Sequence, residues 1–392
     1  MAATFVGFAG FTLVMPFLPL YVAELGVEDV GEIATWTGVS LGVTPAITAL
    51  LAPLWGRLAD RVGRKLLVAR SLVSFIVIMG AMAFVTHPWQ LLALRIVQGV
   101  FAGYGSLCLA MAADCAPRHQ VAQAISLVQT TQRLGPAVGP VLGGIVAGLV
   151  GLRQAFLVTA AFYVVALIQL IVLYREPRVH RAPARERRQS PVTFRSVLAF
   201  ENFVILMGVI FGVQFVDRSL GPVLPLHIAA KGITDVAFAS GVVFSVLALS
   251  AAIGHHVTAR RMRGRSARGL ITRAALVAAV AVAGVGFAPG LWTMMGAAAA
   301  FGYAVGATMT VAYTTAAGVM PASVRGTGFG LLTSASLVGV AASPMVSGLL
   351  AGIDLRAVFL VDAVILCVLA LSVRHVMAET PAAAATPAME DA

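Results

Sequence analysis

The sequence predicts an all-α polytopic membrane protein whose twelve transmembrane helices form two pseudo-symmetric six-helix bundles. The prediction rests on the composition, on apolar runs of membrane-spanning length and on short motifs that repeat between the two halves of the chain. Of the 392 residues, 59% are hydrophobic and only 11% are charged, whereas a soluble domain carries about 25% charged residues. A chain this apolar has too little polar surface for a water-soluble fold.

Apolar runs between charged or Pro/Gly-containing breaks define the predicted helices. Each run is close to the roughly 20 residues that cross a bilayer. The runs are long and rich in Leu and Ala, which favours helices over strands. The predicted helices cover residues 2–23, 33–55, 66–86, 89–113, 121–149, 154–174, 201–228, 236–257, 269–288, 291–317, 325–350 and 356–376.

Lys and Arg are concentrated in alternate connections between these helices, at residues 57–65, 175–195 and 260–273. The positive-inside rule therefore predicts that both termini are cytoplasmic. The net charge of +11 follows from this distribution, so it does not indicate a nucleic-acid partner. We expect a multi-pass protein of the cell membrane, and the wealth of Ala, Gly, Val and Arg points to a bacterial source.

A long polar stretch divides the chain into two similar halves. We expect an N-terminal bundle at 1–174, a basic cytoplasmic linker at 175–200, a C-terminal bundle at 201–376 and a disordered cytoplasmic tail at 377–392. Because the linker is rich in arginine, a lipid-binding or nucleic-acid-binding role is the alternative to a plain linker.

The two halves share sequence matches in the same order. "MPFLPLYVAELGV" aligns with "GPVLPLHIAAKGI", and "GLRQAFLV" resembles "DLRAVFLV". Between these matches, Pro140 and Gly144 fall opposite Pro344 and Gly348. Two parallel six-helix repeats are typical of transporters that bind their substrate between the halves, near the middle of the membrane.

The predicted loop between the second and third helices reads "GRLADRVGRK". It resembles the signature G-x-L-A-D-R-x-G-R-K of the major facilitator superfamily at every defined position. Two glycines permit a tight turn between antiparallel helices. The resemblance implies the major facilitator fold, with Asp60 facing the start of the eleventh helix and Arg64 paired with an acid, here Asp114. The cytoplasmic gate predicted in this way comprises Gly56, Asp60, Arg61, Gly63, Arg64 and Asp114. The alternative is a loop whose arginines only set the topology.

The fourth helix contains Arg95 and, three residues later on the same helical face, Gln98. The segment is similar to the R-x-x-Q-G motif of the superfamily, which implies a role for this arginine in proton coupling. An arginine inside a membrane normally has a partner or faces a water-filled cavity. A purely structural ion pair is the alternative.

The fifth helix contains "RLGPAVGPVLGG". It resembles the helix signature of the drug-antiporter branch of the superfamily, which implies antiport. Glycines four residues apart create a smooth face for close helix packing, so we expect this face to seal against the eighth or eleventh helix. The predicted antiporter motif comprises Gly135, Gly139, Pro140, Gly143 and Gly144.

Asp217 lies deep in the seventh helix and is the first choice for the proton carrier, with Asp362 as the second. A carboxyl group in a low-dielectric environment can exchange a proton near neutral pH. Permanent pairing of Asp217 with Arg218 or Arg95 would prevent this. Arg133, near the middle of the fifth helix, and Arg218 complete the predicted proton-coupling set with Arg95.

Aromatic and amide side chains are expected to line the substrate cavity, because such groups suit a promiscuous binding surface. Packing roles are the alternative for any one of them. The predicted cavity residues are Phe11, Gln98, Gln129, Gln214, Tyr303 and Tyr313.

These features predict a transporter that exports small amphipathic or hydrophobic compounds, such as drugs, in exchange for protons. It would act as a monomer in membrane lipid, with the proton gradient as energy source and without a cofactor. A proton-linked sugar or metabolite exporter or uptake transporter of the same fold is the alternative. An enzyme is not expected, because His, Asp and Cys do not cluster as catalytic groups or metal ligands.

Overall fold

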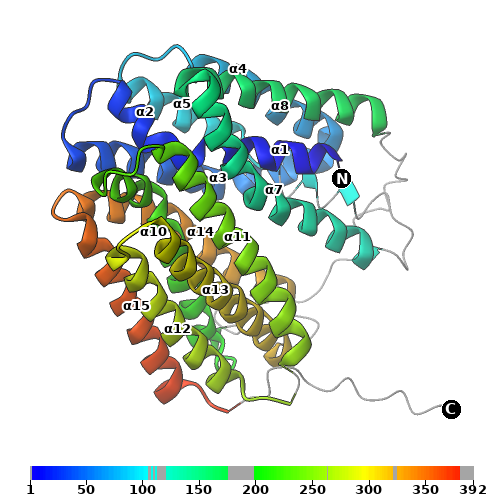
Figure 1. Ribbon diagram of the computed structural model, residues 1–392. Coiled ribbons are helices and arrows are strands. Elements are labelled where there is room, and N and C mark those ends of the chain that lie inside the picture. Colours follow the sequence, from blue (N-terminus) through cyan, green and yellow to red (C-terminus); the bar gives the residue numbers. More distant parts are fainter. Residues whose placement is uncertain are drawn as a thin grey trace. The chain divides into compact units, whose positions relative to one another are not determined.

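The computed structural model describes residues 2–104, 107–108, 111–112, 121–174, 198–262, 264–320 and 325–379. The linker and most of the predicted tail lie outside these residues. Each predicted span has a helical counterpart in the part described (Figure 1). The helices that match the predicted spans most closely are α4 (Arg64–Met82), α7 (Val121–Val150), α8 (Leu152–Leu173), α10 (Phe203–Ala230), α11 (Val236–Arg261), α12 (Ala267–Phe287), α13 (Leu291–Val319), α14 (Arg325–Ala351) and α15 (Leu355–Val376).

The first predicted helix is interrupted at its middle. It consists of α1 (Ala2–Leu13), the 3-10 turn η1 (Met15–Phe17) and α2 (Leu18–Glu24). Pro16 and Pro19 occupy the first turns of the second and third pieces, where a proline lacks only a hydrogen bond that the helix start would not use. The prediction of one continuous helix was therefore wrong in this detail.

The second predicted helix is longer than expected, because α3 spans Val30–Val62. The predicted gate loop is the end of this helix rather than a loop. Only Gly63, with φ of 97°, forms the turn, and α4 begins at Arg64. Gly56 lies inside α3 and takes no part in the turn.

The fourth predicted helix was expected to run without a break from 89 to 113, but α5 (Pro88–Phe101) ends earlier. Ala102 adopts an extended conformation and Gly103 has φ of 113°. A left-handed glycine stops the helical hydrogen-bond ladder, so the helix is discontinuous at this point.

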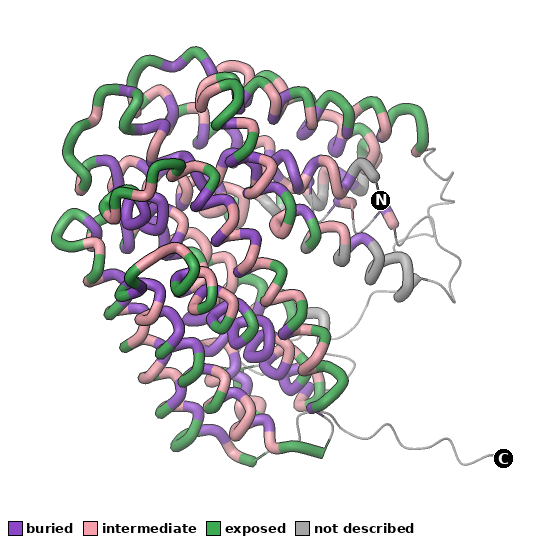
Figure 2. The backbone as a smooth tube through the Cα atoms, in the orientation of Figure 1, coloured by how far each residue is buried: buried purple, intermediate pink, exposed green. Residues whose placement is uncertain are grey.

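Ten helices in the described residues are long and apolar enough to cross a membrane. Many large apolar side chains on them are exposed, among them Leu50 at 78% and Val280 at 75%, which suits a lipid-facing surface. By contrast, α13 is buried along much of its length (Figure 2).

The chain divides into two compact units. Unit 1 contains Met1–Ala184, Ser219–Ala248 and Val340–Val358; unit 2 contains Arg185–Arg218, Leu249–Gly339 and Phe359–Ala392. Unit 1 thus includes two segments of the second half of the chain, and the close helix contacts described below account for this. The predicted boundaries of the two six-helix bundles remain a prediction.

In unit 1, α1 packs on α7 and α8, α3 packs on α5, and α4 packs on α5 and α8. In unit 2, α12 packs on α13. Glycines allow two further close contacts in unit 2, because Gly254 of α11 touches the backbone of α13 and Gly339 of α14 touches that of α10.

Candidate functional site

Three glycines of α7 form a face that packs on α1. The hydroxyl group of Thr12 donates a hydrogen bond to the carbonyl oxygen of Gly135, at 3.2 Å. A side chain at Gly139 would collide with Thr12, and one at Gly143 would collide with the carbonyl group of Leu13. These glycines therefore allow the two helices to approach backbone to backbone.

The other end of the motif packs on α11, which corresponds to the predicted eighth helix. Gly241 of α11 lies against the carbonyl group of Pro140. A Cβ at Gly144 would lie 2.7 Å from Cα of Phe238 and 2.8 Å from the carbonyl oxygen of Ala237. We call this contact the α7–α11 seam. The expected packing against the eighth helix is present, and all five residues belong to unit 1.

A matching contact joins α14 and α3, also within unit 1. Gly38 of α3 lies against the carbonyl group of Pro344, and a Cβ at Gly348 would lie 2.5 Å from the carbonyl oxygen of Ala34. We call this contact the α3–α14 seam. Because Pro344 and Gly348 are the residues that the internal repeat aligns with Pro140 and Gly144, the repeat recurs in three dimensions as two equivalent seams.

Arg95 on α5 is completely buried in unit 1. Its Nη1 donates a hydrogen bond to Oε1 of Gln98 at 3.0 Å, as the spacing on one helical face predicts. Thr44 of α3 donates to the carbonyl oxygen of Arg95 at 2.9 Å. Within the described residues, Nε and Nη2 of Arg95, Nε2 of Gln98 and the hydroxyl of the nearby Tyr163 have no hydrogen-bond partner. This cluster can therefore bind water or an anionic group.

The predicted proton carriers both lie in unit 2. Oδ2 of Asp217 lies 3.4 Å from Nε of Arg218, and the Asp217 side chain is 16% exposed. Of the two partners considered for Asp217, Arg218 is thus in contact with it, at a distance longer than a strong ionic hydrogen bond. Asp362 on α15 is 1% exposed. The side chain of Arg133 lies outside the described residues.

The predicted gate is only partly described. Arg64 begins α4 directly after the Gly63 turn, while Asp114 and the side chains of Asp60 and Arg61 lie outside the described residues. The expected contacts of Asp60 and Asp114 therefore remain predictions.

The neighbouring Lys65 has a role that the sequence analysis missed. Its Nζ donates to the carbonyl oxygens of Tyr174, at 2.6 Å, and Ile171, at 3.2 Å. A cation at the C-terminal end of α8 satisfies free carbonyl groups and complements the helix dipole. The sequence gives no direct sign of this pairing, because α8 lies far along the chain.

The break at the end of α5 is stabilised by two side chains that the sequence analysis also missed. Nε1 of Trp55 donates to the carbonyl oxygen of Val100 at 2.8 Å, and Nη2 of Arg70 donates to that of Phe101 at 3.2 Å. The Arg70 guanidinium also lies 3.7 Å from the centre of the Trp55 ring. In a membrane, carbonyl groups freed by a helix break need such donors. The run "FAGYG" was the only sequence signal for the break.

The predicted cavity residues are distributed over both units, and their common site remains a prediction. Gln214 of α10 donates to the hydroxyl of Ser336 on α14 at 3.1 Å. The ring of Tyr313 stacks on that of Phe329, with the two ring centres 6.4 Å apart. Phe11 is half-buried in unit 1, and the side chain of Gln129 lies outside the described residues.

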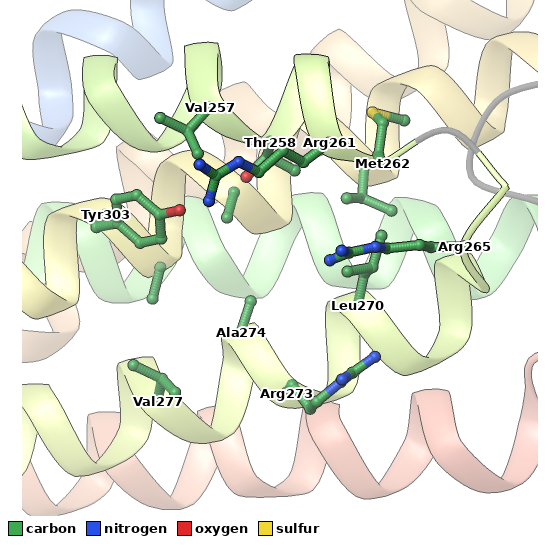
Figure 3. Close-up of a pocket in the computed structure, with 13 residues that line it drawn as sticks. Val257, Thr258, Arg261, Met262, Arg265, Leu270, Arg273, Ala274, Val277 and Tyr303 are labelled. Carbon is green, nitrogen blue, oxygen red and sulfur yellow. The ribbon is translucent and has the colours of Figure 1, made fainter.

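Tyr303 lines a cavity within unit 2. This cavity has a volume of about 290 Å³ and lies between α11, α12 and α13 in unit 2 (Figure 3). Three arginines also line it, namely Arg261, Arg265 and Arg273. Of the six residues predicted to line a substrate cavity, only Tyr303 is among its lining residues.

The sequence profile of the Major Facilitator Superfamily matches residues 1–287 and 265–392. The chain belongs to the Major Facilitator Superfamily. Among curated proteins of this kind, the multidrug resistance protein MdtG of Proteus mirabilis is 35% identical over 249 residues. The MdtG protein of Klebsiella pneumoniae is 33% identical over 245 residues. These matches cover 62% of this chain and 61% and 59% of the two relatives, which is less than two thirds of their length.

Solved structures show the same superfamily fold over nearly the whole chain. A D-xylose-proton symporter aligns with a TM-score of 0.76 at 15% identity, covering 97% of this chain and 98% of that one. A bacterial homologue of the human lysosomal transporter Spinster, in an inward-facing and occupied conformation, aligns with a TM-score of 0.74 at 19% identity, covering 95% and 94%. At these identities the likeness establishes the fold alone.

Glycine and proline gather on α7 where two other helices approach it closely. In this chain one face of α7 meets α1 and the end of the motif meets α11. Both contacts are too close for a side chain at the glycine positions.

Proposed function

We propose that this protein is a secondary transporter, not an enzyme, and that it exports small amphipathic or hydrophobic compounds in exchange for protons by alternating access. The α7–α11 seam is the observation that carries the proposal, because it is built by the motif that resembles the drug-antiporter signature. The multidrug resistance relatives support the same substrate class.

The two seams give alternating access a physical basis. Each seam consists of helices in backbone contact, so it is either closed or separated and has no partly packed intermediate of equal stability. Residues near the predicted extracellular ends of the helices also take part, since Gly31 meets Gly352. The α3–α14 contact thus extends to these ends of the two helices.

Asp217 is the proposed proton carrier and Arg95 the proposed coupling residue. When Asp217 is ionised, its contact with Arg218 stabilises the charge, and protonation releases that arginine. Arg95 keeps a buried positive charge, and its Nε and Nη2 have no hydrogen-bond partner among the described residues. This favours an anionic or hydrated neighbour. Proton binding and substrate binding would then favour different seam states.

The distribution of Lys and Arg supports an orientation with both termini in the cytoplasm of a bacterial cell. The protein would work as a monomer in membrane lipid and would use the proton gradient without a cofactor. Labelling of single cysteines introduced near each terminus, in intact cells, tests the orientation. Reaction with a membrane-impermeant reagent at either terminus would contradict it.

The function can be tested in inside-out membrane vesicles that are acidic inside. Lipophilic cations and neutral drugs are added, and a pH-sensitive dye reports whether each one releases the stored protons. The variants are Asp217→Asn, Asp362→Asn and, as a control, Glu28→Gln, whose side chain is exposed beyond the predicted first helix.

Proton release by the wild type and the control, but not by Asp217→Asn, is the expected result. Release by Asp217→Asn together with loss in Asp362→Asn would move the proton carrier to Asp362 and contradict the assignment of Asp217. No release with any drug would contradict drug antiport and favour a sugar or metabolite transporter. Adding D-xylose or other sugars to the same vesicles tests that alternative.

A further inference from the structure

A basic cavity lies between α11, α12 and α13 at the arginine-rich end of these helices (Figure 3). Arg261 comes from the end of α11, Arg265 from the connection and Arg273 from the second turn of α12. In Figure 3 these guanidinium groups and the hydroxyl group of Tyr303 point toward the cavity between the helices. Its polar lining therefore consists mainly of hydrogen-bond donors with positive charge.

Among the described residues, no acidic side chain balances the positive charge of this cavity. No acidic residue is among its lining residues, and the sequence contains no Asp or Glu at all between residues 236 and 353. Within the described part of the chain, the ion pair between Arg268 and Glu379 involves none of the three lining arginines. An anion that entered the cavity would thus gain from uncompensated charge.

The rest of the lining is apolar. Val257, Leu270, Val277, Ala304 and Val311 contribute to it. Val277 is 51% exposed although it belongs to a membrane-spanning helix, so the cavity continues toward the lipid-facing surface. Such a lining suits hydrocarbon better than a fully hydrated ion.

We propose that this cavity binds the phosphate group of an anionic phospholipid, with the first part of an acyl chain on its apolar side. Guanidinium groups form paired hydrogen bonds with phosphate oxygens, and basic pockets between membrane helices are suited to anionic headgroups. A free phosphate ester carries the same phosphate anion as the lipid, so the arginines alone would bind either one. The apolar lining favours the lipid as its source. The site is independent of the transported compound.

The test is native mass spectrometry of the purified full-length protein in detergent, titrated with phosphatidylglycerol or phosphatidylcholine. The variant Arg261→Gln/Arg265→Gln/Arg273→Gln removes the cavity charges. The control Arg260→Gln/Arg268→Gln/Arg374→Gln removes the same charge from arginines that are not among the lining residues. Because all three lining arginines are exposed, their replacement should leave the fold intact, which thermal unfolding checks.

We expect the cavity variant to bind phosphatidylglycerol at least about tenfold more weakly than the wild type, since each arginine near an anionic headgroup contributes about fivefold. The control should change this affinity less than about threefold, and phosphatidylcholine should bind weakly to all forms. A lysine variant at the three cavity positions should recover part of the affinity, because it keeps the charge.

Equal losses in the cavity and control variants would overturn the proposal, because net charge alone would then explain binding. Soluble glycerol phosphate distinguishes the source of the phosphate. Weak binding of this ester compared with the lipid is expected. Equal binding of the two, or competition at equal concentrations, would overturn the assignment to a lipid. Failure of drug-driven proton release in vesicles would not affect this result.

Discussion

Gly241 of α11 lies directly against the backbone carbonyl group of Pro140 on α7. The proline removes a hydrogen-bond donor from its own helix, and the glycine leaves no side chain in the way. The two helices therefore meet backbone to backbone, as in other close contacts of small residues in membranes. A contact of this kind can be tested one methyl group at a time.

Replacement of Gly144 by alanine should weaken the α7–α11 seam. The new methyl group would lie 2.7 Å from Cα of Phe238 and 2.8 Å from the carbonyl oxygen of Ala237, and backbone atoms cannot rotate away. We expect a loss of about 1–3 kcal/mol of stability, measured by thermal unfolding in detergent. Gly148→Ala is the control on the same helix, because its nearest neighbour would be 3.8 Å away. Equal stability of the two variants would show that the seam is not closed as described.

The seams also show how much of the fold was predictable. The apolar runs predicted the positions of the helices, because the bilayer requires about 20 apolar residues per span, and ten helices in the described residues are long and apolar enough to cross a membrane. The alignment of Pro140 with Pro344 correctly indicated equivalent positions. The partners Gly241 and Gly38 were not identified, because a glycine on an apolar helix does not reveal which helix it meets.

The errors occurred where backbone geometry depends on single residues. The gate motif was predicted as a loop because it is charged, but its residues are compatible with a helix and only Gly63 forms the turn. The break after Phe101 was missed because the surrounding residues are apolar. For the candidate site, the spacing of Arg95 and Gln98 predicted their hydrogen bond, whereas the basic cavity that includes Tyr303 depends on how three helices pack.

Gly63→Ala should destabilise the junction between α3 and α4. The backbone of Gly63 has φ of 97° and ψ of 145°, a region that is open to glycine and costs other residues about 1–3 kcal/mol. Thermal unfolding should show this loss. Gly80→Ala in α4 is the control, since a methyl group there would have no neighbour within 4 Å and alanine favours a helix. The explanation would fail if Gly63→Ala were as stable as the control.

Gln98→Leu should destabilise the protein although the two side chains are similar in size. The change removes the acceptor of the Arg95 guanidinium, which is fully buried, and a lost hydrogen bond to a charged group costs about 1.5–3 kcal/mol. The double variant Arg95→Met/Gln98→Leu should lose less than the sum of the two single changes, because it leaves no buried charge without a partner. Additive losses in thermal unfolding would show that the two side chains do not depend on each other.

Trp55→Phe should weaken the support of the α5 break while keeping an aromatic ring at the position. The phenylalanine ring has no N–H group, so the carbonyl oxygen of Val100 would lose its 2.8 Å hydrogen bond. A weaker ring quadrupole would also reduce the attraction of the Arg70 guanidinium, now 3.7 Å from the Trp55 ring centre. We expect a loss of about 1–2 kcal/mol in thermal unfolding.

Trp292→Phe is the matched control for this change, because the Trp292 side chain is 82% exposed and the same replacement there should be nearly neutral. The variant Arg70→Lys separates the two contributions at the break. Lysine keeps a positive charge and a donor but lacks the planar guanidinium that stacks on the indole ring, so it should fall between the wild type and Arg70→Met. If Trp55→Phe were as stable as Trp292→Phe, the carbonyl of Val100 would not need the indole donor. The break at Gly103 would then depend on the Arg70 hydrogen bond to Phe101 and on backbone geometry.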